Sequence, residues 1–298
     1  MRAVKLVVLA AGHGTRFGGL KQVAAVGPSG EAIMDRTVLH AHDSGVEGVV
    51  LVVRPEIRAE IEAHVRARWP RALPVELVCQ PARPGTAYAV LCTRPVVDGP
   101  FAVANADDLY EPDAFSRLRE HFAPHAISGT RPEHVLVAYE LARTLLGASE
   151  VKRGICTIGE GGELRGVADY RVRHAGEGWF SASPVERALH RDTPPQEDLV
   201  LGADAPVSMN LWGFHPSVYD VLAAAVDPFE PAGPDREVLL PEVLGESVET
   251  GECRVQVLRT TSRCYGITHA GDVELVHAYL ETCERAGEND RPLVGSGA

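Results

Sequence analysis

The segment with the clearest chemical potential is the glycine-rich run V-L-A-A-G-H-G-T-R-F-G-G-L-K at residues 8–21. It begins as an apolar strand, carries Arg16 in its middle and ends at Lys21. Glycines let backbone N–H groups approach a ligand that a β-carbon would keep away, and clustered N–H groups favour bound anions. We therefore predict a phosphate-binding loop to which Arg16 and Lys21 add positive charge.

This loop differs from two common phosphate loops. The Rossmann fingerprint G-x-G-x-x-G needs glycine where Phe17 stands, and the Walker pattern G-x-x-x-x-G-K needs lysine where Leu20 stands. Lys21 is one of only three lysines among 29 basic residues, which indicates a specific role for it. The alternative is an ordinary glycine-rich turn with a solvated lysine.

Two adjacent carboxylates, Asp107 and Asp108, follow the apolar run 101–104. Magnesium prefers oxygen ligands and is usually held by one or two carboxylates together with substrate phosphates. Neighbouring side chains on a strand point to opposite faces, so we assign the metal to Asp107 and a capping or supporting role to Asp108. The alternative is that both carboxylates cap the following helix.

A third segment, Q-P-A-R-P-G-T-A-Y-A-V-L at residues 80–91, starts at the end of a strand and enters a helix. The amide of Gln80 offers a donor and an acceptor, which can match the edge of a nucleobase. Gly85 lets the backbone approach a base, and the helix that starts at Thr86 adds the positive end of its dipole. Gln80 favours uridine or thymidine nucleotides, although an ordinary loop amide would look the same.

The first half of the chain alternates strands and helices. Apolar runs predict buried parallel strands at 5–10, 49–53, 75–78 and 101–104. Helical periodicity occupies 35–43, 56–68, 86–92 and 112–122. This alternation predicts a doubly wound sheet, with ligands across the carboxyl ends of its strands.

The second half is less regular. Its expected strands are 135–139, 207–214 and 254–258, and its expected helices are 216–225, 238–246 and 271–285. We expect the polar, glycine-rich stretch 159–205 to include substrate loops. The chain is expected to be a single domain, 1–290, with a nucleotide-binding half at 1–125, an acceptor-binding half at 126–290 and a flexible tail at 291–298.

Composition excludes several classes of function. The 298-residue chain has a net charge of −12 and no block of basic residues, which argues against binding to nucleic acid. Its six cysteines form no C-x-x-C pair, so we expect reduced thiols and no zinc site. Apolar runs fall short of the ~20 residues that cross a bilayer. A cytoplasmic protein without membrane contact is expected.

In order and spacing, these segments resemble the sugar-phosphate nucleotidyltransferases, or NDP-sugar pyrophosphorylases, with their NTP-transferase domain. The matching motifs are L-A-A-G-x-G-T-R at 9–16 followed by Lys21, then Gln80, G-T-A-x-A-V at 85–90 and Asp107. Two later segments also resemble the family: V-S-M-N-L-W-G-F at 207–214 is similar to its sugar-binding strand, and E-V-L-L-P-E at 237–242 to its second acidic motif.

The resemblance implies an α/β fold, a three-layer α/β/α sandwich with a mostly parallel, Rossmann-like sheet of the GT-A-like type. It also implies a Mg²⁺-dependent enzyme that transfers an NMP from an NTP to a sugar 1-phosphate or a similar phosphorylated acceptor, giving an NDP-sugar and pyrophosphate. The acceptor phosphate is mostly dianionic at neutral pH, so no general base is required. Catalysis would rest on positioning and on charge neutralisation.

The site residues that the resemblance implies fall into four groups. The catalytic residues are Arg16, Lys21 and Asp107. The nucleotide-binding residues are Leu9, Ala10, Ala11, Gly12, Gly14, Thr15, Arg16, Gln80, Gly85 and Thr86. The acceptor-binding residues are Asn105, Lys152, Asp169, Asn210 and Trp212, although core packing explains Trp212 equally well. The metal ligands are Asp107 and Glu242.

The second half departs from the family pattern at two places. Many members carry an E-K-P motif whose lysine grips the sugar phosphate, but this chain reads G-V-A-D-Y-R-V at 166–172. Asp169 stands for the glutamate, and Lys152, Arg153, Arg171 or Arg173 are candidates to replace the lysine, with Lys152 first. The second metal aspartate is here Glu242. These differences suggest an unusual acceptor, such as a cyclitol phosphate, a modified sugar phosphate or another small phosphorylated metabolite.

Two other functions remain open at this level: a GT-A glycosyltransferase, and a catalytically silent nucleotide- or sugar-binding regulatory homologue. The expected partners are a nucleoside triphosphate and a phosphorylated sugar or cyclitol. UTP or dTTP is favoured and CTP is possible, and the chain could form a homo-oligomer.

Overall fold

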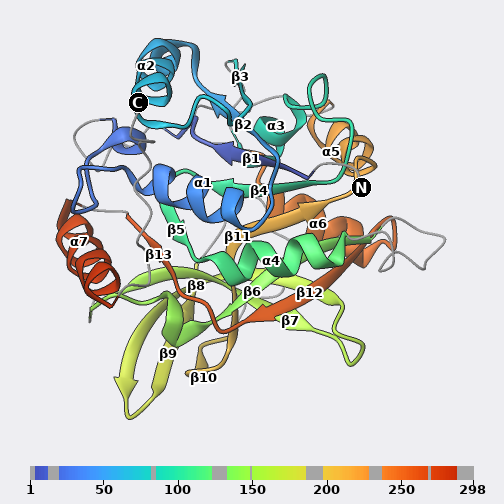
Figure 1. Ribbon diagram of the computed structural model, residues 1–298. Coiled ribbons are helices and arrows are strands. Elements are labelled where there is room, and N and C mark those ends of the chain that lie inside the picture. The colour runs from blue at the N-terminus through green and yellow to red at the C-terminus, as the bar shows by residue number, and fades with distance from the viewer. Residues whose placement is uncertain are drawn as a thin grey trace.

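The computed structural model describes residues 4–12, 20–81, 85–122, 133–147, 150–185, 197–227, 237–267 and 270–286 (Figure 1). The strands are β1 (Lys5–Leu9), β2 (Gly48–Val53), β3 (Val75–Cys79), β4 (Phe101–Asn105), β5 (Asp108–Tyr110), β6 (Glu133–Glu140), β7 (Val151–Ile158), β8 (Leu164–Gly176), β9 (Trp179–Pro184), β10 (Leu199–Gly202), β11 (Pro206–Phe214), β12 (Arg254–Thr260) and β13 (Cys264–Gly266). The helices are α1 (Ile33–Asp43), α2 (Arg58–Arg68), α3 (Thr86–Leu91), α4 (Pro112–His121), α5 (Val218–Val226), α6 (Leu240–Glu249) and α7 (Ala270–Arg285), with short 3-10 helices η1 (Lys21–Val23), η2 (Pro55–Ile57) and η3 (Leu141–Thr144).

The first half forms the parallel part of a large sheet. Strands β4, β1, β2 and β3 lie side by side in that order, and every pair among them is parallel. The apolar runs of β2 and β4 are buried on both faces, as parallel strands covered by helices require, whereas β3 at the sheet edge is only partly buried. The strands and helices expected for this half are confirmed within a few residues.

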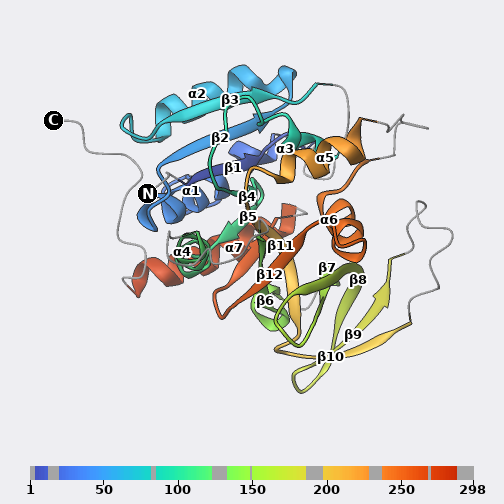
Figure 2. The same cartoon turned by 90° about the vertical axis from the view of Figure 1, so that its right-hand side faces the viewer.

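Helices cover both faces of these strands (Figure 2). Leu6 and Val8 of β1 share a core with α1, α2 and α4, whereas Val7 packs with α3, α5 and α6 on the opposite face. Alternate residues of β1 therefore belong to two separate hydrophobic cores, one on each face of the sheet. This confirms the three-layer α/β/α architecture.

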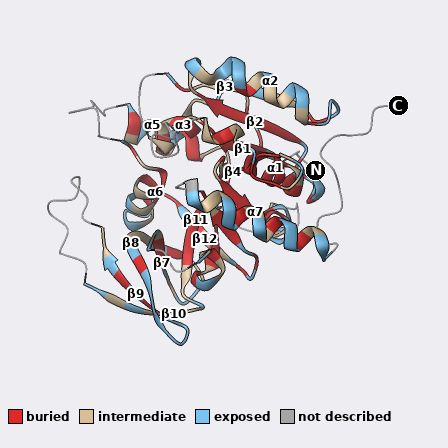
Figure 3. Cartoon of the chain, turned by 90° about the vertical axis from the view of Figure 1, so that its left-hand side faces the viewer, coloured by how far each residue is buried: buried red, intermediate tan, exposed pale blue. Residues whose placement is uncertain are grey.

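The second half is built mainly from antiparallel strands. Within the described residues, eleven strands join one sheet in the order β10-β9-β8-β7-β11-β4-β1-β2-β3, with β6 beside β11 and β12 beside β6. The stretch 159–205, expected to include substrate loops, contains the strands β8, β9 and β10, and the substrate loops themselves stay a prediction. Buried and exposed residues alternate along β9 and along part of β8, where Figure 3 shows mixed burial, so polar residues of this stretch occupy exposed positions on strands.

Strand β11 changes partner along its length. Val207 and Ser208 pair with β7, whereas Trp212 to Phe214 pair with β4, and β6 runs along the other edge with a register shift between Ser208 and Trp212. Asn210 lies inside this irregularity with φ 56°. Asparagine tolerates the left-handed conformation better than most residues, which suits it to this place.

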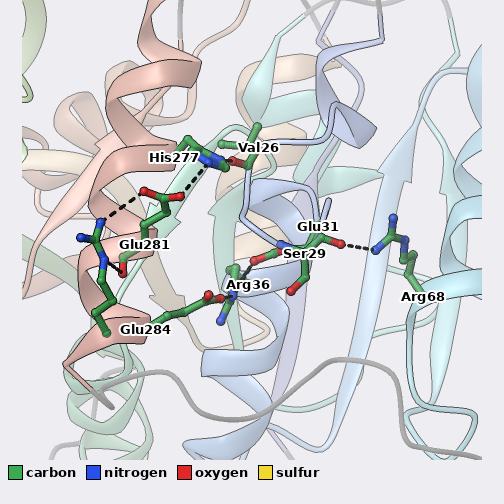
Figure 4. A network of polar contacts seen from close by, with 9 residues as sticks. Val26, Ser29, Glu31, Arg36, Arg68, His277, Glu281 and Glu284 are labelled. Atoms are coloured by element: carbon green, nitrogen blue, oxygen red, sulfur yellow. Dashed lines mark hydrogen bonds and ion pairs between the residues drawn. The ribbon is translucent and has the colours of Figure 1, made fainter.

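A network of charged residues fastens the turn that follows η1 (Figure 4). Arg36 of α1 is paired with Glu31 and with Glu284 of α7, at 2.5 Å in each case. The second oxygen of Glu31 accepts a hydrogen bond from the Ser29 backbone N–H at 2.9 Å. Glu31 and Arg36 are almost completely buried, so each needs the other to offset its lost hydration. The network thus holds α7 against this turn.

Among the described residues, every helix is too short or too polar to span a lipid bilayer.

The buried His134 of β6 should make stability depend on pH. Burial, together with the nearby His215, lowers the pKa of His134 from 6.5 to about 4. Between these values the unfolded chain binds a proton that the folded chain does not, so stability is complete above pH 6.5 and falls as the pH drops toward 4. We expect a loss of about 2 kcal/mol between pH 7.5 and 5 from this residue.

Denaturant unfolding at both pH values measures this loss. In His134→Asn the amide oxygen can still accept the hydrogen bond from the backbone N–H of His215 that His134 Nδ1 accepts at 3.3 Å. The loss of stability between the two pH values should then be smaller than in the wild type by about 2 kcal/mol. The control is His42→Asn, which replaces an exposed histidine. An unchanged pH dependence in His134→Asn would contradict the assignment.

Candidate functional site

Two predicted catalytic residues meet at the carboxyl ends of β1 and β4. Leu9 of β1 lies opposite Asn105 of β4, so the segments that follow both strands leave the sheet at the same level. Lys21, in η1, forms an ion pair with the carboxylate of Asp107. Both side chains keep some exposure, 16% for Lys21 and 33% for Asp107, so solvent or a ligand can reach the pair.

The backbone of Ile267, far away in the sequence, contacts both residues of this pair. Its carbonyl accepts a hydrogen bond from Lys21 Nζ at 2.9 Å, and its N–H donates to the carbonyl of Asp107 at 2.9 Å. Ile267 directly follows β13, which pairs with β5. The backbone of one residue therefore positions both Lys21 and the turn that contains Asp107. No sequence pattern indicated this role for Ile267.

Asp108 lies behind Asp107 in the interior. Its carboxylate accepts a hydrogen bond from the Asn105 amide at 2.7 Å, and its backbone carbonyl accepts one from the Thr37 hydroxyl at 2.8 Å. Burial and the negative charge of Asp107 raise the pKa of Asp108 to about 6. The alternative that both aspartates cap the next helix is wrong, because α4 begins at Pro112.

The start of the glycine-rich loop is fixed by an amide that sequence analysis missed. Gln22 Nε2 donates to the carbonyls of Ala10 at 3.1 Å and Gly12 at 2.8 Å. Ala10 is completely buried, and its N–H donates to the Val52 carbonyl at 2.9 Å. Ala10 thus supports the loop through its backbone, while Leu9 is half-buried against the core.

The remaining predicted residues of this loop differ in exposure. Ala11 is partly exposed and Gly12 is fully exposed, which leaves their backbone accessible. Gly14, Thr15 and Arg16 lie outside the described residues. Their predicted roles in binding phosphate stay predictions.

The start of α3 is tied to the start of α6. Gln80 Nε2 donates to the Gly85 carbonyl at 3.2 Å. Gly85 has φ 115° and packs its backbone directly on Val238, which leaves no room for a β-carbon. The Thr86 hydroxyl accepts the N–H of Leu240 at 2.8 Å. Thr86 and the Gln80 amide thus stabilise the start of α3.

Glu242 lies in the first turn of α6, the helix whose first residue, Leu240, donates to Thr86 at the start of α3. Within the described residues, no three His, Cys, Asp or Glu side chains are placed to share one metal ion. Magnesium does not need three, because it is commonly held by one or two carboxylates and the substrate's phosphates. The partly exposed carboxylate of Asp107 fits that requirement, and the contribution of Glu242 stays a prediction.

The structure separates the candidates for the missing family lysine. Lys152 Nζ is paired with Asp169 at 2.6 Å. Asp169 lies opposite Gly154, which in turn lies opposite Ser208 of β11, so these residues share one face of the sheet. Arg171 is directly opposite Lys152 and reaches this face as well.

Arg153 points to the other face of β7. Its guanidinium donates to the hydroxyl and the carbonyl of Thr144 and to the Lys152 carbonyl, so internal hydrogen bonds already occupy it. Arg171 and Arg173 remain largely exposed and pair with Glu150. Lys152 and Asp169 are thus the pair that the structure brings nearest to β11.

Asn210 and Trp212 have different surroundings. Asn210 is partly exposed at the irregularity in β11, and Trp212 Nε1 donates to its amide oxygen at 3.5 Å. Trp212 itself is 0% exposed and stacks on Phe214, with ring centroids 5.9 Å apart. A ring without exposed surface does not reach an acceptor, so the core-packing alternative accounts for Trp212, and its assignment as an acceptor-binding residue is not retained.

Residues 6–163 match the family described as the MobA-like NTP transferase domain. The chain belongs to this family. The matched range holds Lys21, Gln80, Asp107 and Lys152, whereas Asn210 and other acceptor-side residues lie beyond it.

Individual relatives support the fold. The bifunctional IPC transferase and DIPP synthase of Rubrobacter xylanophilus is 34% identical over 119 residues, 39% of this chain and 26% of that protein, so the chain spans about a quarter of the length of this curated relative. The inositol-1-phosphate CTP transferase structure from T. maritima has a TM-score of 0.63 and 18% identity over 93% of this chain and 96% of that one. UDP-glucose pyrophosphorylase complexed with UDP-glucose has a TM-score of 0.58 and 17% identity over 94% and 99%. These likenesses confirm the GT-A-like fold expected from the sequence.

The close approach at Gly85 of this MobA-like domain predicts an unequal response to alanine. Gly85 and Gly251 both have positive φ, so both substitutions strain the backbone, and Gly85, at φ 115° and ψ 149°, lies in a region that is essentially restricted to glycine, where alanine costs about 1–3 kcal/mol. A β-carbon at Gly85 would lie 2.3 Å from the Val238 carbonyl oxygen, whereas nothing lies within 4 Å at Gly251. Denaturant unfolding should show a further loss of about 1–3 kcal/mol for Gly85→Ala. Equal losses would contradict the role of this contact.

Proposed function

We propose that the protein is a nucleotidyltransferase that moves an NMP from an NTP to the phosphate of a small sugar or cyclitol, with release of pyrophosphate. The observation that carries the proposal is the Lys21–Asp107 pair at the carboxyl ends of β1 and β4. It lies within the segment that matches the NTP transferase family, at the edge where open α/β sheets bind ligands.

The chemistry requires charge neutralisation more than proton transfer. An oxygen of the acceptor phosphate attacks the α-phosphorus of the NTP, the bond from that phosphorus to the bridging oxygen breaks, and pyrophosphate leaves with the electron pair. The nucleophile is already mostly deprotonated at neutral pH. Lys21, with Arg16 as the sequence predicts, would offset the charge that builds on the departing pyrophosphate.

Asp107 would hold Mg²⁺, which supplies positive charge at the α-phosphate. The ammonium of Lys21 balances this carboxylate. With Mg²⁺ held by Asp107, Lys21 would be available to contact a phosphate of the triphosphate. Each charge of the site would then keep a partner of opposite sign, and no isolated charge would be left partly buried.

A cyclitol phosphate is the first acceptor to test. The T. maritima structure is that of an inositol-1-phosphate CTP transferase, and the Rubrobacter relative is named for IPC transfer. Lys152, which is exposed, and Asp169, which is mostly buried, form an ionic pair that could receive a phosphate and a ring hydroxyl respectively. For the base, Gln80 favours uridine or thymidine whereas the T. maritima relative is named for CTP, so the triphosphates have to be compared directly.

Pyrophosphate release should require both substrates. With Mg²⁺ present, five common NTPs are each offered inositol 1-phosphate and a panel of sugar 1-phosphates, and we expect release to be greatest with one NTP and one acceptor together. Asp107→Asn and Lys21→Met should each lower turnover by about 100-fold or more. Lys5→Met is the control, since Lys5 lies at the opposite end of β1.

Three outcomes would oppose the proposal. Near-normal turnover in Asp107→Asn or Lys21→Met would remove these residues from the mechanism. Transfer from an NDP-sugar to a hydroxyl acceptor, without use of an NTP, would favour a glycosyltransferase. Binding of NTP without release across the whole panel would favour a silent regulatory homologue.

Lys152 should affect the acceptor and spare the nucleotide. We expect Lys152→Ala to raise the acceptor KM about 10-fold, because a charge-assisted hydrogen bond to phosphate contributes about 1.5–3 kcal/mol. The NTP KM should be unchanged. Lys5→Ala removes another exposed lysine that is ion-paired, with Glu76 at 3.1 Å, and controls for the loss of a charge. An unchanged acceptor KM in Lys152→Ala would refute this role.

A further inference from the structure

The two halves of the sheet meet at an interrupted strand pair. Trp212 of β11 lies opposite Val103 of β4 in antiparallel register. Extending that register by two residues would place Asn210 opposite Asn105, but the left-handed backbone of Asn210 breaks the ladder there. One predicted acceptor-binding residue therefore adjoins another, at a point where direct strand pairing has stopped.

The hydroxyl of Tyr110 occupies the interrupted position. It accepts a hydrogen bond from the Asn105 N–H at 3.1 Å and donates one to the Met209 carbonyl at 2.6 Å. It also lies 3.2 Å from a carboxylate oxygen of Asp108. A single hydroxyl thus replaces the N–H to C=O bond that an unbroken ladder would have made between β4 and β11.

The surroundings of Tyr110 leave its hydroxyl little freedom. The residue is 0% exposed, and its ring packs against Phe115 and Tyr139, with centroids 6.1 and 6.4 Å away. A ring held in a close-packed core fixes the position of the oxygen at its tip. That oxygen lies between Met209, which precedes Asn210, and Asn105, at the end of the strand that leads to Asp107.

We propose that Tyr110 is a positioning residue, whose hydroxyl bridges Asn105 N–H and Met209 C=O and so holds the acceptor-side Asn210 at a fixed place relative to the metal-side turn. The inference rests on the proposed function. Placement matters because nucleotidyl transfer needs the acceptor phosphate in line with the α-phosphorus, and an error of about 1 Å can cost about 100-fold in rate.

The core supplies a matched control. Tyr139 is also a fully buried tyrosine, 1% exposed, and it packs against Tyr110. Its hydroxyl makes no hydrogen bond within the part of the chain that the structure describes. Tyr139→Phe therefore removes an oxygen from the same core without cutting a bridge, whereas Tyr110→Phe removes the bridge and keeps the ring.

Steady-state kinetics form the first test. In Tyr110→Phe we expect acceptor kcat/KM to fall about 10-fold or more, while the Kd for the NTP stays within about two-fold. Tyr139→Phe should change neither quantity. If Tyr110→Phe behaves like Tyr139→Phe, or weakens nucleotide and acceptor equally, the positioning role is wrong.

A double-mutant cycle tests whether Tyr110 acts through Asn210. Asn210→Gly removes the amide and suits the left-handed backbone. If Tyr110 positions Asn210, then Tyr110→Phe should cost much less in an Asn210→Gly background than in the wild type, because both changes remove the same contribution. Full additivity would overturn the coupling.

Hydrogen exchange tests the bridge without any turnover. In the wild type, the Asn105 amide should be protected like its neighbours in β4, although strand pairing stops there. In Tyr110→Phe, exchange should rise in peptides of both 101–110 and 206–214, and Tyr139→Phe should leave both unchanged. A rise confined to 101–110, or an unprotected Asn105 amide in the wild type, would overturn the bridge.

These readouts separate the two proposals. Absence of transfer in the wild-type protein would defeat the proposed function, while exchange would still decide on the bridge. Normal wild-type transfer with unaltered Tyr110→Phe kinetics would defeat the positioning role alone. If Tyr110→Phe does not fold, protection of the Asn105 amide in the wild-type protein still tests the bridge.

Discussion

The parallel register of β1 and β4 is the constraint on which the candidate site depends. Leu9 stands opposite Asn105, so the glycine-rich loop and the acidic turn leave the sheet at the same edge. Lys21 and Asp107 are distant in sequence, but this register brings their charges together. In a partly buried site, each charge offsets the desolvation of the other until a ligand supplies replacements.

Segments from the end of the chain complete that edge. The backbone of Ile267 forms hydrogen bonds with both Lys21 and Asp107, and the pairing of β13 with β5 fixes its position. A small apolar core that includes Ile33, Leu109 and Val276 lies under α7. The buried Glu31–Arg36 pair attaches α7 to the turn after η1. The C-terminal helix is thus part of what fixes the position of Lys21.

The second half solves a different physical problem, which is how an antiparallel sheet joins a parallel one. Strand β11 pairs with β7 at one end and with β4 at the other. The change requires an irregular backbone, which Asn210 adopts, and it leaves polar groups that strand pairing no longer satisfies. The Tyr110 hydroxyl satisfies two of them. Asn210, which is predicted to bind the acceptor, consequently lies at an irregularity of the sheet.

The sequence by itself determined the layered α/β architecture and the segments that flank the site. Apolar runs of β-branched residues, interrupted by helical periodicity, are local patterns, and they identified the strands and helices of the first half. The glycine-rich loop, Lys21 and Asp107 were recognisable because their chemistry is carried by residue type and short spacing. The same local reasoning did not identify β8, β9 and β10 within 159–205, because strands with solvent-exposed positions carry many polar residues, as loops do.

Only the tertiary structure decided which side chains meet. Lys21 contacts Asp107 and the Ile267 carbonyl, which lie far away in the sequence, and Gln22 bonds back to Ala10, 12 residues earlier. Burial decided that Trp212 is a core residue, and strand register decided that Lys152, rather than Arg153, shares a face with Asp169. Register and burial arise from the packing of the whole chain, so no local pattern around these residues encodes them.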